Sequence, residues 1–368
     1  MKYVLFERHS RMGETVERTT GGAVTAPVVE QPTDWTEPGA HPVVPGVHRI
    51  PLPLPVPSLH AVNVYVIEDP SGLVLVDSGW AMPDARASLE RALRHLGYGL
   101  DDVAQFLVTH AHWDHYSQAL ALRESFGTRV RIGRGERTSI EAFDVRRGRH
   151  PRQVEHLRRC GADAIADEIA GMPMDVSEQD VLPAHPDAWL DDGERLDLAR
   201  RSLDVFATPG HTRGHIVLRD ADAGLLFAGD HILPHITPSI GLETEPEPKP
   251  LRSYLDSLRL VRDMPDTLLL PAHGPVTPSV HTRIDALLRH HAERLDAAAA
   301  QVRAGRATAF KVAAALPWTR RRRTLEELDV FSRMLAVLEI EAHLDVLVDQ
   351  GVLESHDEAG IRRYAVRR

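Results

Sequence analysis

A chain of 368 residues, of which 43% are apolar and 26% charged, is long enough for one large globular domain plus a smaller appendage. Its formal charge of -10 argues against general binding to phosphate backbones, so we do not expect nucleic acid as a partner. A single cysteine excludes an intramolecular disulfide, and the sequence has no signal peptide and no apolar run of about 18 residues. We therefore expect a cytoplasmic protein without a membrane span.

The first half of the chain alternates between strand and helix patterns. Residues 1–46 are rich in Gly, Thr, Pro and Glu, which predicts an extended N-terminal arm. The runs AVNVYVIED and GLVLVDSGW flank the turn Asp69-Pro70-Ser71-Gly72 and predict a hairpin. Apolar spacing predicts a helix over about 82–96. The strand-like run VAQFLVT then ends at a histidine-rich segment, after which a helix is expected from near Ser117.

The middle of the chain adds an insertion and a second block of strands. Residues 136–172 have a helical composition, with Pro151 suited to a first turn. We interpret them as an inserted cover that selects an apolar substrate, or as a solvated flap. Strand patterns return at RSLDVFATPG, GLLFAGD and LLLPAHG, with a helix over 251–261. Two blocks of strands with attached helices predict two sheets packed face to face, in one domain over 47–279.

The last part of the chain differs from the rest. Residues 280–350 are helix-patterned and a hairpin is expected around 357–360, which is the outline of a winged-helix domain over 280–368. Within 325–358 Arg333 is the only Lys or Arg, so the helix that would face nucleic acid is acidic. The basic run 320–323 and the tail residues Arg362, Arg363, Arg367 and Arg368 leave open a local patch for a phosphate-bearing substrate such as a coenzyme A ester or RNA. We expect a packing, pocket-closing or homodimerisation module.

Residues that bind metals follow the ends of several predicted strands. A metal site needs several donor side chains that converge on one point, and imidazole and carboxylate groups are suitable donors. Strand ends meet at one edge in layered α/β folds, so repeated donors at these positions predict a common site. The donors that follow strands are His110, His112, Asp114, His115, His211, Asp230 and His273.

The ordered motifs LVDSG, THAHWDH, TPGHTRGH, GDH and PAHG resemble those of the metallo-β-lactamase fold superfamily, which includes glyoxalase II-like proteins. The resemblance covers about residues 47–278 and implies a mixed α/β fold, a four-layer αββα sandwich with two metal ions. It also implies a set of ligands: His110, His112 and His211 for one ion, Asp114, His115 and His273 for the other, and Asp230 bridging both. The C-terminal part resembles the winged-helix appendage of a β-lactamase-like protein group, some members of which cut single-stranded RNA.

The resemblance also assigns roles beside the ligands. Asp77 in LVDSG would support a ligand without binding metal, and His215 would do the same from a helical turn after His211. Glyoxalase II-like members commonly continue the histidine cluster with two glycines, whereas this chain has Tyr116-Ser117-Gln118. The residues that we expect near a substrate are Trp113, Tyr116, His231 and His235.

The expected chemistry is hydrolysis. Two divalent ions can share a hydroxide at neutral pH, and Asp114 would orient that hydroxide and transfer its proton. Zinc suits these ligands, with iron or manganese as alternatives. We expect a dinuclear hydrolase that uses a metal-bridged hydroxide on a small ester, thioester or lactone. The second ion lacks a Cys donor, which argues against true β-lactamase activity. The alternatives are a phosphodiesterase or endoribonuclease with the same metals, and a winged-helix nucleic-acid-binding protein with a vestigial site.

Overall fold

The computed structural model describes residues 34–55, 59–143, 150–172, 184–243, 245–319 and 321–367. Most of the expected N-terminal arm, residues 1–33, therefore lies outside the described residues. The first sheet has seven strands in sequential order. They are β1 (His41–Val44), β2 (Val47–Pro53), β3 (Ala61–Ile67), β4 (Leu73–Val76), β5 (Val103–Val108), β6 (Arg129–Gly133) and β7 (Ala188–Leu190).

Both pairing modes occur in this sheet. Strands β1 to β4 pair antiparallel, and β4 to β7 pair parallel. The predicted hairpin is β3–β4, whose turn contains Gly72 at φ 119°, a backbone angle that glycine adopts readily. Parallel pairs need crossovers, and helices α1 (Pro83–His95) and α2 (Trp113–Phe126) lie in those from β4 to β5 and from β5 to β6. The first matches the predicted helix over 82–96.

The second sheet has the order β12-β11-β10-β9-β8. Its strands are β8 (Arg195–Asp197), β9 (Ser202–Ala207), β10 (Ile216–Asp220), β11 (Leu225–Gly229) and β12 (Leu268–Pro271). Helix α7 (Pro250–Arg262) joins β11 to β12, which pair parallel. The sequence patterns identified β9, β11 and β12, and the short strands β8 and β10 were not predicted.

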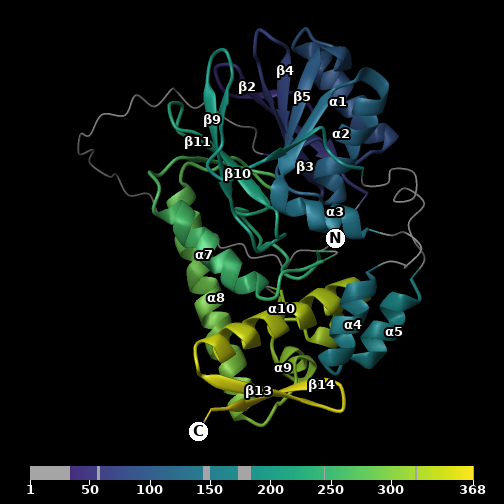
Figure 1. Ribbon diagram of the computed structural model, residues 1–368, viewed down its shortest axis with the longest axis vertical. Helices are drawn as coiled ribbons and strands as arrows, with labels where there is room; N and C mark the ends of the chain where they lie inside the picture. Colours follow the sequence, from purple (N-terminus) through teal and green to yellow (C-terminus); the bar gives the residue numbers. More distant parts are fainter. Residues whose placement is uncertain are drawn as a thin grey trace.

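The two sheets pack face to face between layers of helices (Figure 1). Buried apolar side chains of both sheets form the central layer, with Tyr65 and Phe227 in edge contact at 5.5 Å between ring centroids. Helices α1 and α2 cover the outer face of the first sheet. Helix α7 and the first half of α8 (Val280–Arg303) cover that of the second. This confirms the expected αββα sandwich.

A separate helical core lies below the sandwich in Figure 1. It contains the second half of α8, α9 (Ala309–Ala315), α10 (Val330–Asp349) and the hairpin β13 (Leu353–Glu358)–β14 (Ile361–Val366). The hairpin was predicted. The order of helices followed by a hairpin agrees with the expected outline, and the winged-helix assignment stays a prediction, as does the boundary near residue 280.

The predicted insertion over 136–172 contains α3 (Arg137–Ala142), α4 (Pro151–Arg159) and α5 (Asp163–Ala170), and residues 144–149 within it lie outside the described residues. Helices α4 and α5 pack against α10 and share its apolar core. An ion pair between Arg333 and Glu168, 2.6 Å apart, joins α10 to α5. These two helices are therefore buried in the C-terminal core and do not form a solvated flap, and the role of a substrate-selecting cover stays a prediction.

Across the described residues, no helix combines the length and the apolar composition that a membrane span requires. Cys160 is free and buried in the helical core.

Candidate metal centre

The residues of the THAHWDH motif lie where β5 ends and α2 begins. Strand β5 ends at Val108, and His110 and His112 occupy the connection to α2. Helix α2 begins at Trp113, earlier than the expected start near Ser117, so Asp114 and His115 lie in its first turn. A carboxylate is favoured there because the first turn of a helix carries a partial positive charge. The buried strand and the helix start thus present four donors at one edge of the sheet.

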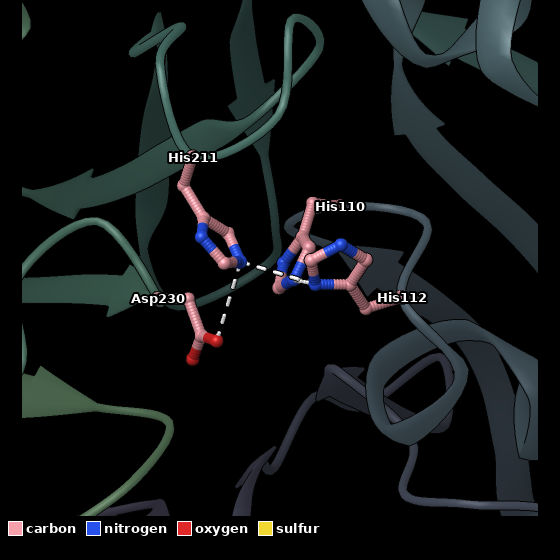
Figure 2. Close-up of side chains that lie close together, drawn as sticks. All are labelled: His110, His112, His211 and Asp230. Atoms are coloured by element: carbon pink, nitrogen blue, oxygen red, sulfur yellow. Dashed lines mark hydrogen bonds and ion pairs between the residues drawn. The ribbon is translucent and has the colours of Figure 1, made fainter. Parts of the chain in front are cut away.

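The first group of donors brings together both sheets. His110 and His112 come from the β5–α2 connection, His211 from the β9–β10 connection, and Asp230 from the end of β11 (Figure 2). His112 Nδ1 lies 3.0 Å from His110 Nε2 and 3.1 Å from His211 Nε2. Asp230 Oδ2 lies 3.4 Å from His211 Nε2. These four atoms face one another at the spacing expected around a shared cation.

The second group lies beside the first and consists of Asp114, His115 and His273. His273 follows β12, and its Nε2 atom lies 3.3 Å from Asp114 Oδ2. Asp230 Oδ1 faces this group, at 3.6 Å from His115 Nε2 and 3.4 Å from His273 Nε2. The two oxygens of Asp230 therefore face different groups, which is the arrangement that a bridging carboxylate requires.

Hydrogen bonds on the far side of the imidazole rings set their orientation. The Nδ1 atoms of His115, His211 and His273 face Asp77 Oδ2 at 2.9 Å, the Ser239 carbonyl at 2.7 Å and the Ala61 carbonyl at 2.8 Å. Because these partners accept hydrogen bonds, each Nδ1 carries the proton. Once Nε2 has no proton, its lone pair faces the centre, which is the tautomer that binds metal.

Asp77 and His215 both contact the chain around the ligands. Asp77 also accepts hydrogen bonds from the backbone and hydroxyl of Thr109, at 2.8 and 3.0 Å. His215 Nε2 accepts a hydrogen bond from the backbone N–H of Asp230 at 3.1 Å, and its ring stacks on that of His110. His215 directly precedes β10, so the expected helical turn at this position is wrong. Its supporting position comes from a tight turn between two strands.

The electrostatics of the centre favour a bound cation. Burial lowers the pKa of His110 well below its ordinary value and that of His112 to about 3, so both are neutral and can donate lone pairs. Burial raises the pKa of Asp114, but His115, His273 and His112 together lower it by more, so the carboxyl group stays ionised. Within the part of the chain that the structure describes, both Asp114 oxygens and His115 Nε2 are buried without a hydrogen bond. Buried carboxylate and imidazole atoms left this way fit divalent metal ligands.

The four residues expected near a substrate differ in exposure. Tyr116 and His231 are buried, at 2% and 0% exposed, and Tyr116 donates a hydrogen bond to the Ala184 carbonyl at 2.6 Å. His231 packs edge-on against Tyr254 in the outer layer of the second sheet. Trp113 and His235 are half-buried. Tyr116 and His231 are therefore packed inside the protein, and the place of all four residues near a substrate stays a prediction.

Residues that hold the loop of His273 were not predicted from the sequence. Asn63 donates hydrogen bonds to the carbonyls of Pro271 and Gly274, at 2.9 and 2.8 Å, on either side of the ligand. Arg49 in turn donates to Asn63 Oδ1 at 2.9 Å. The one available signal was a polar Asn in the otherwise apolar strand AVNVYVI. Glu136, which contacts two ligand loops, was missed for lack of any local pattern.

Comparisons with known proteins agree with this geometry. Residues 57–273 match the family model described as the metallo-beta-lactamase superfamily. A crystal structure of a metallo-beta-lactamase family protein from Thermus thermophilus is 29% identical and covers 88% of this chain and 99% of its own, with a TM-score of 0.69. A beta-lactamase domain protein from Burkholderia ambifaria is 30% identical over 89% of this chain and 94% of its own, with a TM-score of 0.71.

Curated relatives give the same result. The probable metallo-hydrolase YqjP of Bacillus subtilis is 25% identical over 324 residues, which are 84% of this chain and 94% of the relative. A hydroxyacylglutathione hydrolase of Aeromonas hydrophila is 28% identical over 218 residues, 59% of this chain and 63% of the relative. The chain therefore belongs to the metallo-beta-lactamase superfamily of hydrolases, and it carries a buried histidine–aspartate cluster suited to divalent metal ions.

Proposed function

We propose that this protein is a dinuclear metal-dependent hydrolase of small esters, thioesters or lactones, with zinc as its metal. The observation that carries the proposal is the pair of adjacent donor groups, with the two Asp230 oxygens directed to different groups. His110, His112 and His211 would hold one ion, Asp114, His115 and His273 the other, and Asp230 both. Two bound divalent ions would supply a strong nucleophile from water at neutral pH and polarise the bond to be cleaved.

The side chains around the ions would orient the reactants and move protons. Asp114 is buried and ionised, and both its oxygens lack hydrogen bonds within the described residues, so it can accept a proton from water while it holds its place in the second group. Asp77 fixes the His115 ring through a 2.9 Å contact. Six of the seven ligands are buried and His112 is half-buried, so we place the substrate on the side of His112 and Trp113.

The substrate class rests on three supporting observations. The second donor group contains no cysteine, and a sulfur ligand is expected of the most familiar antibiotic-degrading enzymes of this fold. The formal charge of -10 disfavours a nucleic-acid substrate. The relative from Aeromonas hydrophila is named for hydrolysis of a hydroxyacyl glutathione, which is a thioester. Together these observations favour acyl over phosphoryl transfer.

A panel of substrates tests the proposal. The zinc-loaded protein would be assayed with acyl-coenzyme A, S-acyl glutathione, a lactone, nitrocefin and bis-nitrophenyl phosphate. We expect turnover of one or more of the acyl substrates that carry an ester or thioester bond, and loss of that turnover in Asp230→Ala. Turnover of the phosphodiester alone would replace the proposal by phosphodiesterase activity. A folded protein that binds no metal and cleaves nothing would favour a vestigial site.

A further inference from the structure

A buried carboxyl group lies beside the metal centre and is not one of its seven donors. Glu136 ends the short 3-10 turn η2 (Arg134–Glu136), which follows β6, and its side chain is 1% exposed. We infer that Glu136 is a positioning residue that fixes the loop of His110 and His112 against the loop of His211, and thereby shapes the site of the first ion. This inference rests on the proposed function, because it assumes that these histidines bind metal.

The contacts of Glu136 reach both ligand loops. Its Oε1 atom accepts a hydrogen bond from the hydroxyl of Thr212, the residue after His211. The backbone N–H groups of Ala111 and Gly214 lie beside the same carboxyl group: burial raises the pKa of Glu136 to about 7, and these N–H groups and the Thr212 hydroxyl oppose that rise. Ala111 separates His110 from His112 in the chain. One carboxyl group therefore contacts a loop from each sheet, at positions next to three proposed ligands.

Close backbone packing fixes the position of Glu136. A Cβ atom added to Gly133 would lie 2.2 Å from the Gly214 carbonyl oxygen, and one added to Gly135 would lie 2.6 Å from Gly214 Cα. A Cβ atom added to Gly214 would lie 2.0 Å from the backbone N of Glu136. No side chain fits between these two segments. The turn that carries Glu136 therefore lies directly on the loop of His211, with little freedom to shift.

A second buried carboxyl group holds the other side of the same loop. Glu243 is 4% exposed and accepts a hydrogen bond from the backbone N–H of Arg213 at 2.9 Å. It also accepts one from the hydroxyl of Ser139 in α3 at 2.7 Å. The chain after His211 is thus held at consecutive residues by Glu136 and Glu243. Since His211 directly precedes Thr212 and Arg213, the two carboxyl groups also fix the position of its imidazole ring.

The contacts of Glu136 predict an effect on one ion and not on the other. Its partners Ala111, Thr212 and Gly214 belong to the loops of the first donor group. In the second group, His115 is held by Asp77 and the loop of His273 by Asn63. Loss of Glu136 should therefore weaken the first ion selectively, whereas general damage to the fold would weaken both.

The substitution Glu136→Gln tests this role while keeping the size of the side chain. The amide cannot ionise and can turn N–H donors toward the N–H groups of Ala111 and Gly214, which cannot accept them. Affinity for Zn²⁺ would be measured by competition with a chelator in two backgrounds. His273→Ala leaves the first donor group complete, and His211→Ala leaves the second complete.

We expect Glu136→Gln to weaken Zn²⁺ binding by about 10- to 100-fold in the His273→Ala background, the range found when partners of metal ligands are removed. In the His211→Ala background the affinity should not change. Glu341→Gln is the matched control, because Glu341 is 7% exposed on α10, in the helical core. It should leave both affinities unchanged.

Two further measurements keep the outcomes distinct. Thr212→Val removes only the hydroxyl donor to Glu136 and should weaken the first ion in the same direction, by a smaller factor, even if Glu136→Gln fails to fold. The visible spectrum of bound Co²⁺ in the His273→Ala background should change with Glu136→Gln, since it reports ligand geometry. Equal weakening in both backgrounds, or unchanged affinity in the first, would overturn the inference. A parent chain that takes up no metal would instead overturn the proposed function.

Discussion

Replacing Asp77 by asparagine tests how the second donor group is held in its metal-binding form. Asp77 has a positive φ of 60°, and asparagine tolerates this conformation better than alanine does. Asp77→Asn therefore changes the chemistry of the side chain and spares the backbone. The amide oxygen can still accept hydrogen bonds from Thr109, while the amide nitrogen takes the place of Oδ2 and faces His115 Nδ1.

The expected loss follows from that one contact. A charge-assisted hydrogen bond is replaced by two opposed donors, at a cost of about 1.5–3 kcal/mol. If the His115 ring avoids this by moving its proton to Nε2, the nitrogen that faces the centre loses its lone pair. Either response weakens the second ion by about 10- to 100-fold, which corresponds to roughly 1.4–2.7 kcal/mol. The two estimates agree because both describe the same hydrogen bond.

Competition with a chelator measures the affinity for Zn²⁺, and urea unfolding of the metal-free chain measures the loss of stability. Asp220→Asn is the matched control, since Asp220 is 1% exposed and paired with Arg201 at 2.7 Å, on β10. It should lower stability and leave metal affinity unchanged. If Asp77→Asn bound both ions as tightly as the unaltered chain, the role assigned to Asp77 would be wrong.

Three further predictions concern protons, metal and the loop of His273. Burial lowers the pKa of His115, but Asp114, Asp77 and Asp230 raise it to about 10. Metal uptake should therefore release a proton, and the affinity for Zn²⁺ should increase with pH up to about pH 10. Titration calorimetry in buffers of different ionisation enthalpy measures the proton release, and a metal affinity independent of pH would refute the prediction. Removing metal should lower the melting temperature, because a free metal concentration of about 100 times Kd adds about 2.7 kcal/mol to the free energy of unfolding. Adding metal back should restore the melting temperature, and an unchanged thermal transition would contradict this prediction. Asn63→Ala leaves the buried Gly274 carbonyl without its donor and should lower the free energy of unfolding by about 1–3 kcal/mol. Urea unfolding measures this loss, and an unchanged urea midpoint would show that the hydrogen bond is dispensable.

Local patterns predicted the parts of the fold that local sequence controls. The β3–β4 hairpin and α1 follow from a turn signal and from apolar spacing, and both formed as expected. The start of α2 was placed too late, because Trp113, Asp114 and His115 interrupt the apolar spacing that was used to locate helices. Asp114 and His115 of the second donor group therefore lie in a helical turn that the apolar spacing did not reveal.

Other features depend on contacts between distant residues and have no local pattern. Glu168 in α5 pairs with Arg333 in α10, 165 residues away, so the sequence could not show that α4 and α5 belong to the C-terminal core. Glu136 contacts Thr212, 76 residues away, through a turn that close glycine packing fixes. The metal-binding side chains could be predicted because they follow strand ends, which meet at one edge of the sheets. The residues that hold their loops lie on other elements and follow no such pattern.

The metal content of the purified chain, measured together with its hydrolytic activity, tests the central claim most directly. Elemental analysis should give about two transition-metal ions per chain, since the two donor groups share Asp230 as a bridge. Chelation should abolish hydrolysis of the preferred acyl substrate, and added Zn²⁺ should restore it. A folded preparation that is free of metal and fully active would contradict the account.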